Sequence, residues 1–126
     1  MHRTRFDVAP DPDLDPQLGL LLAMLDDGTA EWLEELGPAS EDDIVWQPHP
    51  HGHSVGGVML HIVDVEAHSL HHVAAGRPRD PQELKTLLSE ETDQDGGRWP
   101  APPRRPSAWY VAQHAAVSQR THALVP

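Results

Sequence analysis

The fold prediction rests first on the segment of residues 54–76, which reads SVGGVMLHIVDVEAHSLHHVAAG. Its apolar side chains recur at steps of three and four residues, which predicts one broad buried face of a helix and excludes a strand, whose period is two. Those side chains are Val55, Val58, Met59, Ile62, Val63, Leu70 and Val73. We expect Ser54 to cap the helix, and Gly76 and Pro78 to end it after about residue 75.

Towards the N-terminus, residues 16–36 predict a long amphipathic helix. Asp15 can cap it, Pro16 suits its first position and Gly37-Pro38 supplies a stop. One buried face is expected from Leu18, Leu21, Leu22, Leu25, Trp32, Leu33 and Leu36. Residues 1–14 are predicted to be an extended lead-in. Residues 37–53 are predicted to be a connection in which Ile44, Val45 and Trp46 pack back against the helices.

Towards the C-terminus, Asp80-Pro81 repeats the signal of a cap followed by proline, and predicts a short exposed helix to about Glu91. Residues 92–106 are rich in proline and glycine and predict a long crossover. A last helix is expected from Ser107 to about Ala123. Its inner side is predicted to carry Tyr110, Val111, Val117, Thr121, Leu124 and Val125.

Three long helices and one short helix, without any strand pattern, predict an all-α protein. Amphipathic helices of this kind bury their faces against one another, so we expect an up-down helical bundle. The bundle is predicted to occupy residues 15–126 as a single domain.

Composition excludes several classes of function. The chain has no cysteine, so disulfides, thiolate zinc sites and thiol catalysis are excluded. A formal net charge of −11 argues against nucleic acid or anionic lipid as a partner. No apolar run is long enough for a membrane span, and the first residues do not form a secretory signal, so a cytoplasmic location is expected.

The sequence contains ten histidines, whose imidazole side chains are candidate metal ligands. His49, His51 and His53 alternate in a loop and would either grip a transition metal or stay solvated. His61, His68 and His72 form a stripe on the helix of residues 55–75. His61 and His68 lie about 10 Å apart along the helix axis and cannot share one metal, whereas His68 and His72 are one turn apart and can. The alternative is a solvent-facing or interfacial stripe.

Two further ionisable residues fall on apolar helix faces. Glu66 lies within the apolar face of its helix, where an unpaired carboxylate would be costly, so it needs a partner. That partner would be an arginine, a histidine ring or a metal-bound group. His114 lies at the centre of the last helix's inner face, either as a hydrogen-bonded core residue or as a metal ligand.

The segments Ile44-Val45-Trp46-Gln47-Pro48 and Ser54-Val55-Gly56-Gly57-Val58-Met59-Leu60-His61-Ile62-Val63-Asp64-Val65-Glu66 resemble the signature of the DinB-like superfamily. That superfamily includes mycothiol-dependent maleylpyruvate isomerase and bacillithiol transferases. Its members share a tryptophan–x–proline loop, a helix start of small residues, and a histidine followed five positions later by glutamate. The resemblance covers about residues 15–125.

This resemblance implies a four-helix bundle that is usually dimeric and holds zinc or nickel. It implies that His61 is a ligand and that Glu66 is the acidic residue of the motif. The family's other two ligands form an HxxxH pair on a fourth helix, and by family length we expect this chain to end after the third. A second chain, or His114, would then have to supply the remaining ligands.

Three functional hypotheses follow. The first is a metal-dependent protein that activates a small-molecule thiol or water for transfer or hydrolysis, with His61 and His114 as candidate ligands. The second is a non-catalytic helical module that completes its bundle as a homodimer. The third is a carrier of metal or a small molecule that uses the histidine-rich surface. No nucleophile elbow, phosphate loop or HExxH motif is present, so we assign no catalytic residue.

Overall fold

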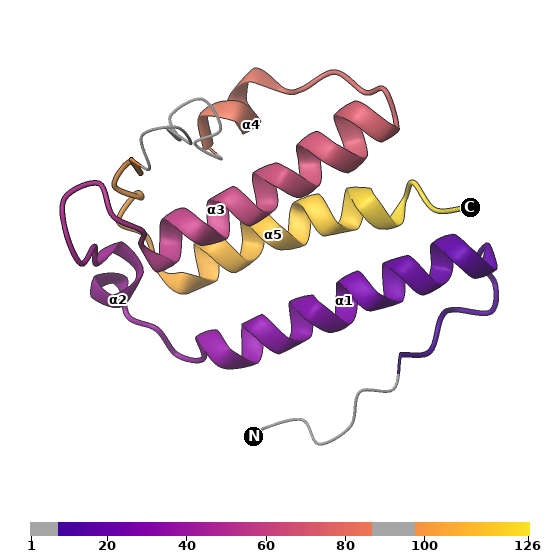
Figure 1. The fold of residues 1–126 in the computed structure, drawn as a ribbon, viewed down its shortest axis with the longest axis horizontal. Coiled ribbons are helices and arrows are strands. Elements are labelled where there is room, and N and C mark those ends of the chain that lie inside the picture. Colours follow the sequence, from indigo (N-terminus) through magenta and orange to yellow (C-terminus); the bar gives the residue numbers. More distant parts are fainter. Residues whose placement is uncertain (1–7, 87–97) are drawn as a thin grey trace. The chain divides into compact units, whose positions relative to one another are not determined.

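A computed structural model describes residues 8–86 and 98–126, and helices dominate both ranges (Figure 1). They are α1 (Pro16–Leu36), α2 (Glu41–Val45), α3 (Val55–Glu66), the π-helix η1 (Ala67–Ala74), α4 (Pro81–Thr86) and α5 (Ser107–His122). These described ranges contain no strand, which confirms the all-α prediction. None of their helices is long and apolar enough to cross a membrane.

The predicted helix starts are confirmed at atomic level. Asp15 caps α1 by accepting hydrogen bonds from the backbone N–H groups of Gln17 and Leu18, and Pro16 occupies the first position. Ser54 caps α3 through the backbone N–H of Gly57, at 3.0 Å. Gly37 closes α1 with a φ of +52°, a value that glycine adopts without strain.

The helix α2 lies in the segment predicted to be an irregular connection. Ser40 and Asp43 form a reciprocal capping box, in which each side chain accepts a hydrogen bond from the other residue's backbone N–H. The hydrogen bond that the Ser40 backbone N–H donates to the Asp43 carboxylate is the main cause that holds the pKa of Asp43 below its usual value, and the Ser40 side chain adds to it. The helix is too short to show periodicity in the sequence. Ile44 is buried as expected, but Trp46 is 66% exposed, so its predicted packing is wrong.

The helix of residues 55–75 changes its hydrogen-bonding pattern after Glu66. In η1 the backbone N–H of Ala75 donates to Leu70 O, five residues back, at 3.0 Å. The eight residues of η1 are too few for their apolar spacing to distinguish a π-helix from an α-helix, so the change was not predicted. Gly76, with a φ of +68°, follows the end of η1, close to the predicted stop.

The chain divides into two compact units, which we describe separately. The first comprises residues 1–38 and 122–126, and the second comprises residues 39–121. In the first unit, Asp15 N donates to Pro126 O at 3.0 Å, and His122 Nε2 lies 2.8 Å from Asp26 Oδ1. The single domain expected over residues 15–126 stays a prediction.

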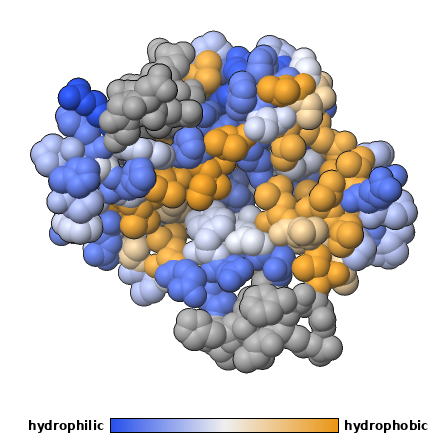
Figure 2. Space-filling model, in the orientation of Figure 1, coloured by the Kyte–Doolittle hydropathy of each residue, from blue (hydrophilic) through white to orange (hydrophobic). Residues whose placement is uncertain are grey.

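The leucine face predicted for α1 is buried only in part, and Trp32, Leu33 and Leu36 are half-buried. Leu22 is buried, whereas Leu18, Leu21 and Leu25 are 44%, 61% and 38% exposed. Figure 2 shows apolar side chains of this kind at the surface, in orange among hydrophilic groups. The spacing therefore predicted the helix correctly, but the predicted burial is wrong for Leu18, Leu21 and Leu25.

In the second unit, α3 and α5 lie side by side (Figure 1). Its buried apolar side chains are Ile44, Met59, Leu60, Val63, Ala67, Tyr110 and Val117. The buried face of α3 is rotated from the predicted one, because Val55, Val58 and Ile62 are 41%, 37% and 40% exposed. Gly56 lies on the buried face, where the absence of a side chain lets Tyr110 and Ile44 approach the helix closely.

The remaining segments agree with prediction where the structure describes them. The helix predicted from Pro81 to about Glu91 is present as Pro81–Thr86, and residues 87–91 lie outside the described residues. Asp80 caps its start through Gln82 N at 2.9 Å. Of the predicted crossover, residues 98–106 are non-helical and residues 92–97 lie outside the described range.

Candidate functional site

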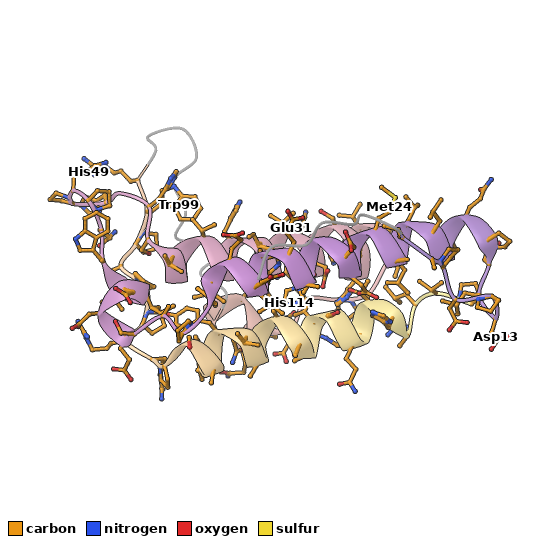
Figure 3. The ribbon with its side chains drawn as sticks, turned by 90° about the horizontal axis from the view of Figure 1, so that it is seen from below. Asp13, Met24, Glu31, His49, Trp99 and His114 are labelled. Atoms are coloured by element: carbon orange, nitrogen blue, oxygen red, sulfur yellow. The ribbon has the colours of Figure 1, made fainter. Side chains whose placement is uncertain are left out.

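Trp99 organises the loop that precedes α3. Its backbone N–H donates to His51 O at 2.9 Å, and Gln47 Nε2 donates to Gly52 O at 2.9 Å. His51 has a φ of +63°, which is uncommon for a residue with a side chain. His49 and Trp99 lie at the same end of the second unit (Figure 3). These contacts give the loop that carries His49, His51 and His53 a defined conformation.

Two histidine rings pack against the indole of Trp99. The centroids of the His53 and Trp99 rings are 4.6 Å apart at 84°, and those of His61 and Trp99 are 5.1 Å apart at 73°. Both contacts are edge-to-face, which orients the imidazoles. His61, the ligand implied by the resemblance, is half-buried beside this tryptophan. The role of Trp99 had no signal in the sequence, because the contact joins the crossover to residues far earlier in the chain.

His68 and His72 form a second group on the exposed side of η1. Their ring centroids are 5.6 Å apart at 37°, as the one-turn spacing predicted. Nδ1 of His72 lies 2.8 Å from Arg77 O. A carbonyl oxygen accepts only, so Nδ1 carries the hydrogen and Nε2 keeps its lone pair in the neutral ring.

Glu66 and His114 are both buried, as their positions on apolar helix faces predicted. Glu66 is 8% exposed and His114 is 5% exposed, and each has an interaction partner. Figure 3 shows His114 midway along α5. Residues five positions apart on an α-helix differ by about 140° around its axis. The half-buried His61 and the buried Glu66 therefore project to different sides of α3.

The described residues contain no group of three or more His, Cys, Asp or Glu side chains that could hold a metal ion. The loop histidines His49, His51 and His53 do not form such a group, and neither His61 nor His114 belongs to one. Catalytic zinc is normally held by about three protein ligands. The described part of one chain therefore does not form a complete site of that kind, and His61 and His114 stay predicted ligands.

His71, which was not among the residues predicted to be buried, is a buried polar link between η1 and α5. Thr121 Oγ1 donates to Val117 O at 3.2 Å, so it accepts from His71 Nε2 at 2.9 Å. Burial is the main cause that lowers the pKa of His71, and the positive charge of Arg120 adds to it. Its position four residues after the buried Ala67 was the signal that could have identified it.

A chain of charged side chains runs beside this link. Arg79 Nη2 lies 2.6 Å from Asp64 Oδ1, and Arg79 Nε lies 3.8 Å from Glu83 Oε2. Glu83 in turn forms an ion pair with Arg120. Arg79, Asp64 and Glu83 are mostly buried, with side chains 11%, 14% and 14% exposed. The chain joins α3, α4 and α5 with alternating charges, so we interpret it as structural.

Comparison of the sequence with protein-family models and curated proteins, and of the fold with solved structures, gave no match. The candidate site is therefore defined by its own geometry. Two histidines pack on Trp99 at the start of α3, and two more form a pair on η1. His2 lies outside the described residues.

Proposed function

We propose that the chain is a DinB-like helical protein that acts as a homodimer and binds zinc or nickel, with His61 as one ligand. The second copy supplies the ligands that the described part of one chain does not bring together. When bound, the metal would lower the pKa of a coordinated thiol or water and so activate it for transfer or hydrolysis. No reaction step is assigned to individual residues.

The local structure of the motif supports this proposal. Ser54 caps α3, and Gly56 lets α3 approach Tyr110 closely. Both features are what a small-residue helix start within a helical bundle requires. His61 follows on the first turns of the same helix, with its ring oriented by Trp99.

The observation that carries the proposal is an exposed apolar stripe on α3. It consists of Val55, Val58, Ile62 and Val65, which are 41%, 37%, 40% and 46% exposed. Their spacing of three, four and three residues is that of a seam between two packed helices. His61 lies directly beside Ile62 at the edge of this stripe, so a helix packed on the stripe would bring its own side chains close to His61.

The experiment measures association and metal content in the same samples. Ile62→Glu places a charge in the stripe, and its burial should weaken dimerisation at least about tenfold, equivalent to about 1.4 kcal/mol. Sedimentation equilibrium gives the association, and elemental analysis after exhaustive dialysis gives the metal per chain. Ala112→Glu, at an exposed position on α5, is the matched control and should change neither quantity.

His61→Ala separates the two parts of the proposal. It should remove the dialysis-resistant metal and leave the dimer intact. A wild-type chain that is monomeric at micromolar concentration contradicts the proposed homodimer. A dimer that never contains metal contradicts the metal site and favours the alternative, a non-catalytic dimerising module.

A further inference from the structure

We propose that His68 and His72 form a two-histidine binding site for a divalent transition metal on the exposed side of η1, with Cu²⁺ bound most tightly. This site is separate from the predicted site at His61 and does not depend on the proposed function. It requires no residue from a second chain.

The separation of the two rings fits a shared metal. Metal–nitrogen bonds of about 2.0–2.1 Å place the centroids of two coordinating imidazoles about 4.5 Å apart at the cis angle of a tetragonal Cu²⁺ site, and about 5 Å apart at a tetrahedral angle. The His68 and His72 centroids are 5.6 Å apart in the structure. The side chain of His68 is exposed, so a small rotation about its side-chain bonds closes the difference without displacing the core.

His72 is already arranged as metal ligands usually are. A ligating histidine generally donates its second ring N–H to a carboxylate or a backbone carbonyl, which fixes the tautomer and the ring orientation. The bond from His72 Nδ1–H to Arg77 O, at 2.8 Å, does this. It leaves the Nε2 lone pair available for the metal.

The preference among metals follows from the ligands. Imidazole nitrogens bind Cu²⁺ more tightly than Ni²⁺ or Zn²⁺, in the Irving–Williams order. Two protein ligands leave the other coordination positions to water, so a chelator should remove the metal easily. The formal net charge of −11 favours the approach of a cation.

The test is calorimetric titration of chelator-treated protein with CuSO₄. The starting protein is His61→Ala, so that failure of the site proposed at His61 does not affect the result. We expect one equivalent of Cu²⁺ to bind with at least about tenfold higher affinity than in the double variant His61→Ala/His72→Ala. Because His72 is exposed, the variant should keep the circular dichroism of its parent.

The control adds His49→Ala to the same parent. His49 is also exposed, and its Nδ1 donates to Pro50 O at 3.1 Å, so it matches His72 in tautomer but lacks a ring one turn away. This control should bind Cu²⁺ as its parent does. Unchanged binding after His72→Ala overturns the proposal, as does an equal loss in the His49 control, which would place the metal on the loop histidines.

Discussion

Gly56 is the residue whose small size decides how the second unit packs. A Cβ atom at this position would lie 2.9 Å from Cγ2 of Ile44 and 2.9 Å from Cζ of Tyr110. Tyr110 has little room to move, because its ring is 1% exposed and its hydroxyl donates to Pro103 O. The same burial raises the pKa of Tyr110 to about 12.

We predict that Gly56→Ala lowers the free energy of unfolding by about 1–3 kcal/mol, the usual cost of overpacking a core. Urea denaturation measures this loss. Gly28→Ala is the matched control, because nothing lies within 4 Å of a Cβ at that helical position. It should raise the stability by about 0.5–1 kcal/mol through helix propensity. Equal effects of the two substitutions would contradict the close approach at Gly56.

We expect His71 to make the free energy of unfolding fall as the pH is lowered. Its folded pKa is below the usual histidine value of 6.5, mainly through burial and Arg120, with Arg77 and Arg79 acting in the same direction and Glu83 opposing them. The unfolded chain therefore binds a proton at this residue more readily than the folded chain does. The contribution of His71 is fully present above about pH 6.5 and is lost as the pH falls through the lower folded pKa.

We predict that the wild type loses more stability than His71→Gln when the pH is lowered from 7.5 to 5.5, as measured by urea denaturation. Thr121→Val serves as a second probe, because it leaves the N–H of His71 without its acceptor. It should cost about 1–3 kcal/mol at pH 7.5. Identical pH profiles for wild type and His71→Gln would show that His71 does not titrate differently on folding.

At the scale of elements, Arg79 connects α3 to α4. We predict that Arg79→Ala destabilises the protein by about 1–3 kcal/mol, because it leaves the mostly buried carboxylate of Asp64 without its cation, whereas Glu83 keeps its ion pair with Arg120. Thermal and urea denaturation measure the loss. The matched control is Arg104→Ala, which breaks an ion pair to Asp42 whose side chains are 58% and 86% exposed. It should change the stability by less than about 1 kcal/mol.

The boundaries of long helices were predictable because their signals are local. At Asp15 and at Ser54, the capping side chain and the backbone N–H groups that it caps lie within three residues of each other. A short stretch of sequence is therefore enough to predict where each helix begins. The helix α2 and the π-helical hydrogen bonds of η1 were not predicted. The first is too short for periodicity, and the second differs from an α-helix only in which carbonyl each N–H selects.

At the level of the whole molecule, the proposed function depends on an apolar stripe that faces outward on α3. The stripe Val55, Val58, Ile62 and Val65 is exposed, although its spacing is that of a core seam. A seam of this kind on the surface is the feature that an association partner would cover. In the proposed homodimer the second copy covers this stripe, and the variant Ile62→Glu tests that proposal.

Caps, prolines and helical spacing act within a few residues, so the helical class of the described residues, the starts of α1, α3, α4 and α5, and the burial of Glu66 and His114 could be predicted from the sequence. Only the tertiary structure decided which face of α3 is buried, because Gly56 and Tyr110 meet across a long sequence separation. It also placed His61 against Trp99 and His71 against Thr121. Such contacts depend on how distant segments pack, and local spacing carries no information about that.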